Sequence, residues 1–184
     1  MARTLIPSSI RSQPIGNTPL RRRPLEKLGP VSSIGVVILS FAAQSFLPRY
    51  VSWAGAFDLP LLIVVYLALT ERDVPRGILI GAVIGLAQDA LSHGPIGGFG
   101  IIKTVIGYLA ASMSRIVEID YPVIRGILAA LFFLIHHLLF WVMQTVLLGI
   151  NVSFDPARTL VMSAAYAGLA LLLFPLIDRL KRAR

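Results

Sequence analysis

The pattern of apolar and polar positions divides the chain into six apolar stretches that are separated by short polar turns. The stretches cover approximately residues 31–48, 55–70, 75–92, 97–114, 122–150 and 156–178. An apolar helix of about 20 residues is long enough to cross a hydrocarbon core of about 30 Å. The pattern therefore predicts six membrane-spanning helices, which together form one membrane domain over residues 31–178.

Composition leads to the same fold class. The chain of 184 residues is 56% hydrophobic and 14% charged, and its mean hydropathy is +0.79. A soluble domain of this size has too much surface to bury so many apolar side chains. We therefore expect an all-α integral membrane protein. Cysteine is absent from the sequence, which excludes disulfides, thiolate metal ligands and a cysteine nucleophile.

Both ends of the chain are polar and basic. Residues 1–30 are broken by prolines and lack the early apolar core of a signal peptide, so we interpret them as a mostly disordered cytoplasmic tail. Residues 179–184 form a second basic tail. Of the 17 lysines and arginines, only Arg49 and Arg158 fall in the segments that are outside when the N-terminus is inside, and Lys103 lies within a stretch. Because basic loops stay in the cytoplasm, both termini are predicted to be cytoplasmic.

The same asymmetry explains the net charge of +8. Basic residues near the membrane surface attract anionic lipid, and lipid is therefore a predicted partner. The basic runs RRR and RLKRAR contain no aromatic residues, whereas proteins that bind single-stranded nucleic acid usually interleave the two. Nucleic acid is not an expected partner.

The third stretch contains a ridge of small residues. Gly77, Gly81 and Gly85 are spaced four apart, and Asp89 follows at the same spacing. Glycines at this spacing allow another helix backbone to approach closely. We favour packing inside the six-helix bundle; contact with another chain is the alternative.

A glycine-rich turn connects the third and fourth stretches, with Asp89 before it and Lys103 after it. The two charged residues lie at similar depth on neighbouring antiparallel helices, which predicts an ion pair or a shared water-filled pocket. The alternative is that Lys103 extends to the lipid headgroups. Gly94, Gly97, Gly98 and Gly100 make the turn flexible enough for backbone contact with a partner, or they serve only to form the turn.

Polar residues gather in the outer half of the predicted bundle. They are Gln44, Asp58, Asp89, Lys103 and Gln144. Ionisable residues in a membrane usually mark a functional feature, and this group predicts a cavity or interface that is open to the outside. The alternative is that the stretches are drawn too long. Pro60 lies within the second stretch, where it is expected to interrupt helical hydrogen bonding.

Two adjacent histidines, His136 and His137, lie in the middle of the fifth stretch. Adjacent side chains point about 100° apart on a helix, so the two rings cannot easily share a metal ion. We expect neutral histidines that are hydrogen-bonded between helices. No nucleophile, phosphate loop or metal motif is recognisable, and the sequence predicts neither an enzyme nor a cofactor or metal site.

Two segments resemble the rod shape-determining protein MreD family: DLPLLIVVYLAL at 58–69 and RGILIGAVIGLAQDALSHGPIGGFGIIKTVIGYLA at 76–110. The resemblance covers about residues 57–115. It is carried by Asp58, Tyr66, Ala68, Gly77, Gly81, Gly85, Gln88, Asp89, Ser92, Gly94, Pro95, Gly97, Gly107, Tyr108 and Leu109.

The resemblance implies a non-enzymatic component of the bacterial cell-elongation machinery in the inner membrane. Its expected partner is MreC, which connects it indirectly to MreB, to the polymerase RodA and to the elongation transpeptidase; formation of a homo-oligomer stays open. The family is also similar in its six-helix architecture to the substrate-binding subunits of energy-coupling-factor transporters, and a transporter subunit is therefore the alternative function. The expected partner-binding or structural residues are Asp58, Gly77, Gly81, Gly85, Gln88, Asp89, Gly94, Pro95, Gly97 and Lys103.

Overall fold

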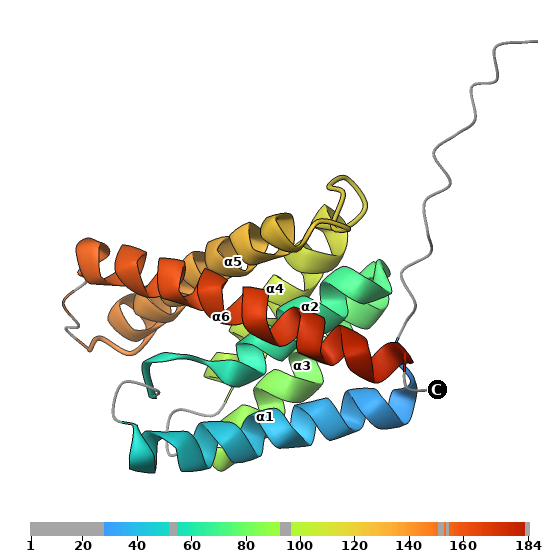
Figure 1. The fold of residues 1–184 in the computed structure, drawn as a ribbon. Coiled ribbons are helices and arrows are strands. Elements are labelled where there is room, and N and C mark those ends of the chain that lie inside the picture. Colours follow the sequence, from blue (N-terminus) through green and yellow to red (C-terminus); the bar gives the residue numbers. More distant parts are fainter. Residues whose placement is uncertain (1–27, 52–54, 93–96, 151–152, 154, 183–184) are drawn as a thin grey trace, which may run out of the picture.

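The structure, a computed structural model, describes residues 28–51, 55–92, 97–150, 153 and 155–182. The regular secondary structure in these residues is helical (Figure 1). Its elements are α1 (Pro30–Tyr50), α2 (Leu59–Glu71), α3 (Val74–Leu91), α4 (Gly98–Met113), α5 (Pro122–Val142), the π-helix η2 (Met143–Leu147) and α6 (Pro156–Arg182). Each predicted stretch thus corresponds to one α-helix.

Three boundaries differ clearly from the prediction. Helix α2 begins at Leu59, four residues after the predicted start at residue 55. The fifth stretch does not continue as an α-helix to residue 150, because the helix changes to the π-helix η2 after Val142. The sixth helix continues beyond residue 178 to Arg182, and the expected C-terminal tail is therefore largely helical.

Helix α2 lies at the centre of the bundle. Every residue from Pro60 to Thr70 is buried, and the helix contacts α1, α3, α4 and α5. This burial follows from the sequence of α2, because a helix that is apolar on all sides has no face that favours water.

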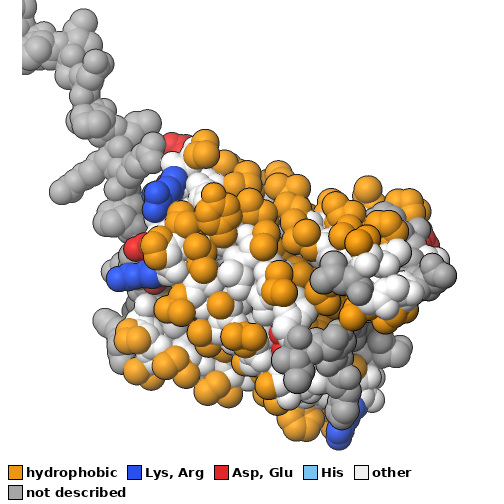
Figure 2. Space-filling model, turned by 180° about the vertical axis from the view of Figure 1, so that it is seen from behind, with side chains coloured by type: hydrophobic (Ala, Val, Ile, Leu, Met, Phe, Trp, Pro, Cys, Tyr) orange, Lys and Arg blue, Asp and Glu red, His pale blue; other side chains and the backbone are white. Residues whose placement is uncertain are grey.

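The other helices surround α2, and four of them are long and apolar enough to cross a membrane: α1, α3, α5 with part of η2, and α6. Helix α2 has 13 residues and α4 has 16. At 1.5 Å per residue they extend about 20 Å and 24 Å, less than a hydrocarbon core of about 30 Å. Large apolar side chains cover much of the outer surface, as Figure 2 shows for one face. The described residues thus form four helices long and apolar enough to cross a membrane and two shorter ones, which indicates a membrane protein.

The helices alternate in direction, so their ends form two groups. The start of α1 and the end of α6 lie at one end of the bundle (Figure 1), which we call the terminal end. At the opposite end, the distal end, α1 and α3 finish and α2, α4 and α6 begin. Location of the terminal end in the cytoplasm stays a prediction from the distribution of lysine and arginine.

The glycine ridge of α3 packs against α4. A Cβ atom at Gly77 would lie 2.6 Å from the carbonyl oxygen of Gly107, and one at Gly85 would lie 2.7 Å from the Cα atom of Gly100. At Gly81 it would overlap the backbone of Lys103. Such close approach of two backbones requires glycine. The ridge therefore lies where the packing interpretation expects it, inside the bundle.

Candidate functional site

One polar residue from each of the six α-helices or their caps lies in a buried to half-buried cluster near the distal end. The members are Gln44 of α1, Asp58 at the start of α2, Gln88 of α3, Lys103 of α4, His136 of α5 and Tyr166 of α6. We call this cluster the polar hub. It is the candidate functional site because it brings together charged groups that an apolar bundle otherwise excludes.

Lys103 is the cation of the hub, and its side chain is completely buried. Its Nζ atom lies 2.8 Å from Oδ1 of Asp58 and also donates a hydrogen bond to Oε1 of Gln88. The Nζ atom lies 5.6 Å from the ring centroid of Phe99, within the range of a cation–π contact. The predicted ion pair between Asp89 and Lys103 is wrong, because the partner of Lys103 is Asp58. The alternative that Lys103 extends to the headgroups is also wrong, since the side chain lies inside the bundle.

Asp58, at the start of α2, contacts residues of α3, α4, α5 and α6. Its Oδ1 atom accepts a hydrogen bond of 2.9 Å from the backbone N–H of Leu61 and so caps α2, while Oδ2 accepts one of 3.4 Å from Gln88. Its backbone carbonyl accepts a hydrogen bond of 2.8 Å from the hydroxyl of Tyr166. Asp58 thus precedes α2, and Pro60 lies in the first helical turn. A proline is well accommodated there, because the first N–H groups of a helix have no intrahelical partner. The expected interruption by Pro60 does not occur.

Gln44 and His136 complete the hub on two further helices. Oε1 of Gln44 accepts a hydrogen bond of 2.8 Å from the backbone N–H of Leu59, which joins α1 to α2. Nε2 of His136 lies 3.6 Å from Oδ2 of Asp58, and Nδ1 is buried without a hydrogen-bond partner in the described residues. His137 points elsewhere and stacks on Phe133 with the ring centroids 5.4 Å apart. The two histidines therefore diverge, as helix geometry predicts.

Asp89 has a separate role next to the hub. It is 2% exposed, and its two carboxylate oxygens accept hydrogen bonds of 2.9 Å and 2.8 Å from the backbone N–H groups of Phe99 and Gly100. Asp89 thus caps the start of α4, where the helix dipole favours a negative charge. Gly97 precedes α4 with φ of 99°, a conformation that favours glycine. Gly94 and Pro95 lie outside the described residues.

The Asp89 cap leads to a testable prediction. We expect Asp89→Ala to reduce the free energy of unfolding by about 0.5–2 kcal/mol, because two backbone donors inside the bundle lose their acceptor. The measurement is the thermal unfolding midpoint of the purified protein in detergent. Asp73→Ala is the matched control, since Asp73 caps α3 with a longer bond of 3.5 Å at an exposed position. Equal shifts for the two variants would contradict a special role for the buried cap.

A second polar cluster lies near the terminal end and was not predicted from the sequence. The hydroxyl of Tyr66 donates a hydrogen bond of 2.7 Å to one carboxylate oxygen of Asp178, and Arg125 forms an ion pair of 2.7 Å with the other. Nε of Arg125 donates to the carbonyl of Ile119 at 2.6 Å. The available signal was Asp178, an acidic residue at the end of an otherwise apolar and basic helix. This cluster ties α2, the start of α5 and the end of α6 together.

The contacts of these groups connect helices to one another. The charged atoms of the hub contact one another, and each contact joins two different helices. No group of three or more histidine, aspartate or glutamate side chains is arranged to hold a metal ion within the part of the chain that the structure describes. Tyr166 was missed by the sequence analysis; a tyrosine in an apolar helix was the only signal, because a buried hydroxyl needs a partner.

A family model described as rod shape-determining protein MreD matches residues 27–183. The match extends well beyond the segment of about residues 57–115 on which the resemblance rested, and it includes every helix and both polar clusters. No curated protein and no solved structure matches the chain, so the similarity to energy-coupling-factor subunits stays a prediction. Because the family model covers nearly the whole chain, the protein belongs to the rod shape-determining protein MreD family.

Proposed function

We propose that the chain is a non-enzymatic scaffold of the bacterial cell-elongation complex in the inner membrane, with both termini in the cytoplasm. In this role it binds MreC and helps to control cell shape and peptidoglycan synthesis. Through MreC it is connected indirectly to RodA, the elongation transpeptidase and MreB. Membership of a shape-determining family supports this role and a non-enzymatic function.

The observation that carries the proposal is the polar hub. Its side chains contact one another or the backbone at the start of α2, and these contacts connect the six α-helices of the described residues. Polar networks that connect several elements help to fix the relative positions of those elements. A scaffold needs such a rigid body, because a partner that docks on several helices loses less entropy when those helices are already fixed.

Buried residues would then influence a partner indirectly. Asp89 is 2% exposed and Lys103 is fully buried, so neither side chain is available at the surface. They hold the start of α4 and the start of α2 in place at the distal end. The glycine ridge is covered by α4. We therefore expect MreC to contact the outer surfaces of the helices and the distal end, whose shape depends on these buried contacts.

The test is purification of the tagged full-length protein from its native membrane in mild detergent, followed by mass spectrometry of the proteins that co-purify. We expect MreC, together with proteins of cell-wall synthesis. An unrelated multi-helix membrane protein with the same tag, expressed at the same level, is the control. Recovery of an ATPase pair with a coupling membrane subunit, in place of MreC, would contradict the proposal.

A further inference from the structure

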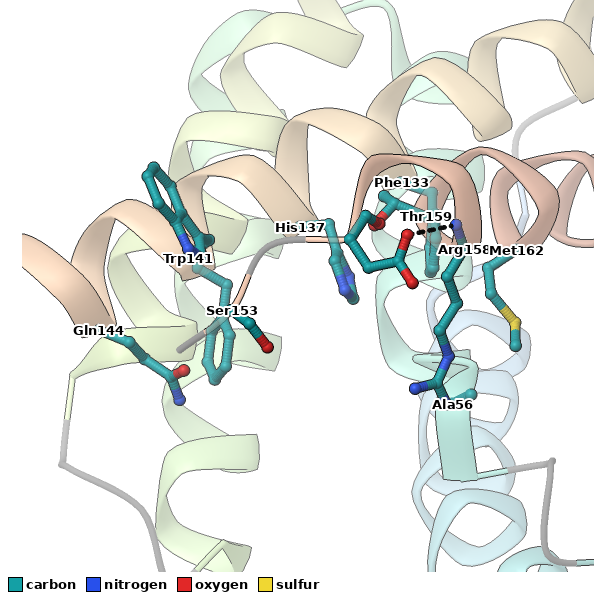
Figure 3. A pocket seen from close by; sticks show the side chains of 11 residues that line it. Ala56, Phe133, His137, Trp141, Gln144, Ser153, Arg158, Thr159 and Met162 are labelled. Atoms are coloured by element: carbon teal, nitrogen blue, oxygen red, sulfur yellow. Dashed lines mark hydrogen bonds between the residues drawn. The ribbon is translucent and has the colours of Figure 1, made fainter. Parts of the chain in front are cut away.

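A cavity of about 360 Å³ lies between α5 and α6 near the distal end (Figure 3). Its apolar lining includes Phe133, Phe140, Trp141 and Met162. Ligand cavities usually have volumes of about 300–1,000 Å³ and combine an apolar wall with a few polar groups. This cavity is large enough for a small organic molecule or for part of a lipid.

The polar lining comes from both helices. His137 and Gln144 belong to α5 and η2, and Arg158 belongs to the first turns of α6; all three border the same space in Figure 3. The backbone N–H of Arg158 donates a hydrogen bond of 3.1 Å to Oδ1 of Asp155, which caps α6. The guanidinium of Arg158 forms no ion pair with a carboxylate of the described residues, and Arg158 is exposed, so a ligand can reach its charge; Asp155 also lines the cavity.

A second, smaller cavity of about 240 Å³ adjoins the first. The two share Ala56, Phe133, His137 and Phe140 in their linings. The smaller cavity reaches the polar hub at His136, which is 5% exposed and whose Nδ1 atom has no partner in the described residues. A buried polar atom without a partner is costly, and such atoms often have an unseen partner. The smaller cavity thus ends at a histidine with unused hydrogen-bonding capacity, and the Nδ1 atom itself is buried.

The local backbone positions one polar residue of the lining. Gln144 lies on the π-helix η2, which follows α5 after Val142 and gives its side chain a direction that a continued α-helix would not give.

We propose that the two adjoining cavities bind an organic anion. Its phosphate or carboxylate group contacts Arg158 and His137, because a guanidinium binds such groups through paired hydrogen bonds. When the anion is a lipid, its acyl chains lie against the aromatic side chains of α5. The source of this chemistry is either the headgroup of an anionic membrane lipid or a small soluble anion. The inference goes beyond the scaffold function and does not depend on it.

The test uses fluorescence of Trp141 in the full-length protein in detergent. The sequence has two tryptophans, and a Trp53→Phe background leaves Trp141 as the only one. The probes are phosphatidylglycerol with brominated acyl chains, which quenches tryptophan on contact, the corresponding brominated phosphatidylcholine, and glycerol 3-phosphate. We expect saturable quenching by the anionic lipid, and a loss of affinity of about tenfold or more in Arg158→Gln, since a charged hydrogen bond is lost.

The control variant is Arg49→Gln, which removes an arginine at the distal end of α1 that does not line the cavity. Quenching by phosphatidylglycerol that depends on Arg158 and exceeds the quenching by phosphatidylcholine supports an anionic lipid. If instead the two lipids quench equally, and glycerol 3-phosphate reduces the quenching only when Arg158 is present, the result supports a soluble anion. Equal binding by the Arg158→Gln and Arg49→Gln variants, or no saturable effect with any probe, overturns the proposal. If Arg158→Gln does not fold, Arg158→Lys carries the same test, with a smaller expected loss because one cationic donor remains.

Discussion

Substitution of Lys103 with methionine is expected to lower the free energy of unfolding by about 3–5 kcal/mol, the range for removing one partner of a buried ion pair. The side chain of Lys103 is fully buried, and that of Asp58 is 12% exposed. Methionine has a similar length but no charge, so the carboxylate of Asp58 would remain in an apolar bundle without its cation. Oε1 of Gln88 would also lose the hydrogen bond that it accepts from Lys103. The loss is a large fraction of the total stability of a typical domain, about 5–15 kcal/mol.

The measurement is the thermal unfolding midpoint in detergent, together with the yield of monodisperse protein. Arg49→Met is the matched control, because Arg49 is an exposed cation at the distal end of α1. The double variant Lys103→Met/Asp58→Asn should recover part of the loss, since it removes both charges and keeps an oxygen acceptor for the N–H of Leu61. A single variant as stable as Arg49→Met would show that the Asp58–Lys103 pair contributes nothing to the fold.

The second large effect is expected at the contact of α3 with α4. Gly81→Leu should lower the free energy of unfolding by more than about 3 kcal/mol, the upper end of the usual range for overpacking. A Cβ atom there would lie 2.7 Å from the carbonyl carbon of Lys103 and 3.0 Å from the Cα atom of Thr104. These are backbone atoms, which cannot rotate away. The helices must therefore separate, and the separation also moves Lys103 away from Asp58.

Gly168→Leu is the matched control, because a Cβ atom at Gly168 of α6 would have no atom within 4 Å. Both substitutions add the same side chain to a membrane helix, so their difference measures the close contact alone. Thermal unfolding in detergent and retention of rod shape in cells that depend on the variant provide two readouts. Normal stability and normal shape with Gly81→Leu would show that α3 and α4 do not pack as closely as the structure has them.

The six α-helices could be predicted from the sequence because helix formation in lipid depends on local properties. Runs of apolar residues, prolines and polar turns lie next to one another in the chain, and they determine where a helix begins and ends. The same holds for the ridge of Gly77, Gly81 and Gly85, since a spacing of four places residues on one side of a helix. The π-helix at Met143–Leu147 could not be predicted, because nothing in its apolar sequence distinguishes it from an α-helix.

The partners of the buried charges were decided by the tertiary structure. The sequence placed Lys103 beside Asp89 because the two flank one turn, yet Lys103 pairs with Asp58, 45 residues away in the chain. Asp89 instead caps α4, using backbone groups that no residue pattern identifies. The sequence by itself determined that the protein is a helical membrane protein with charged residues near one end of its helices. Only the packing of α2 at the centre determined which of those charges meet, because the partner of a buried side chain depends on the relative positions of helices that are distant in the chain.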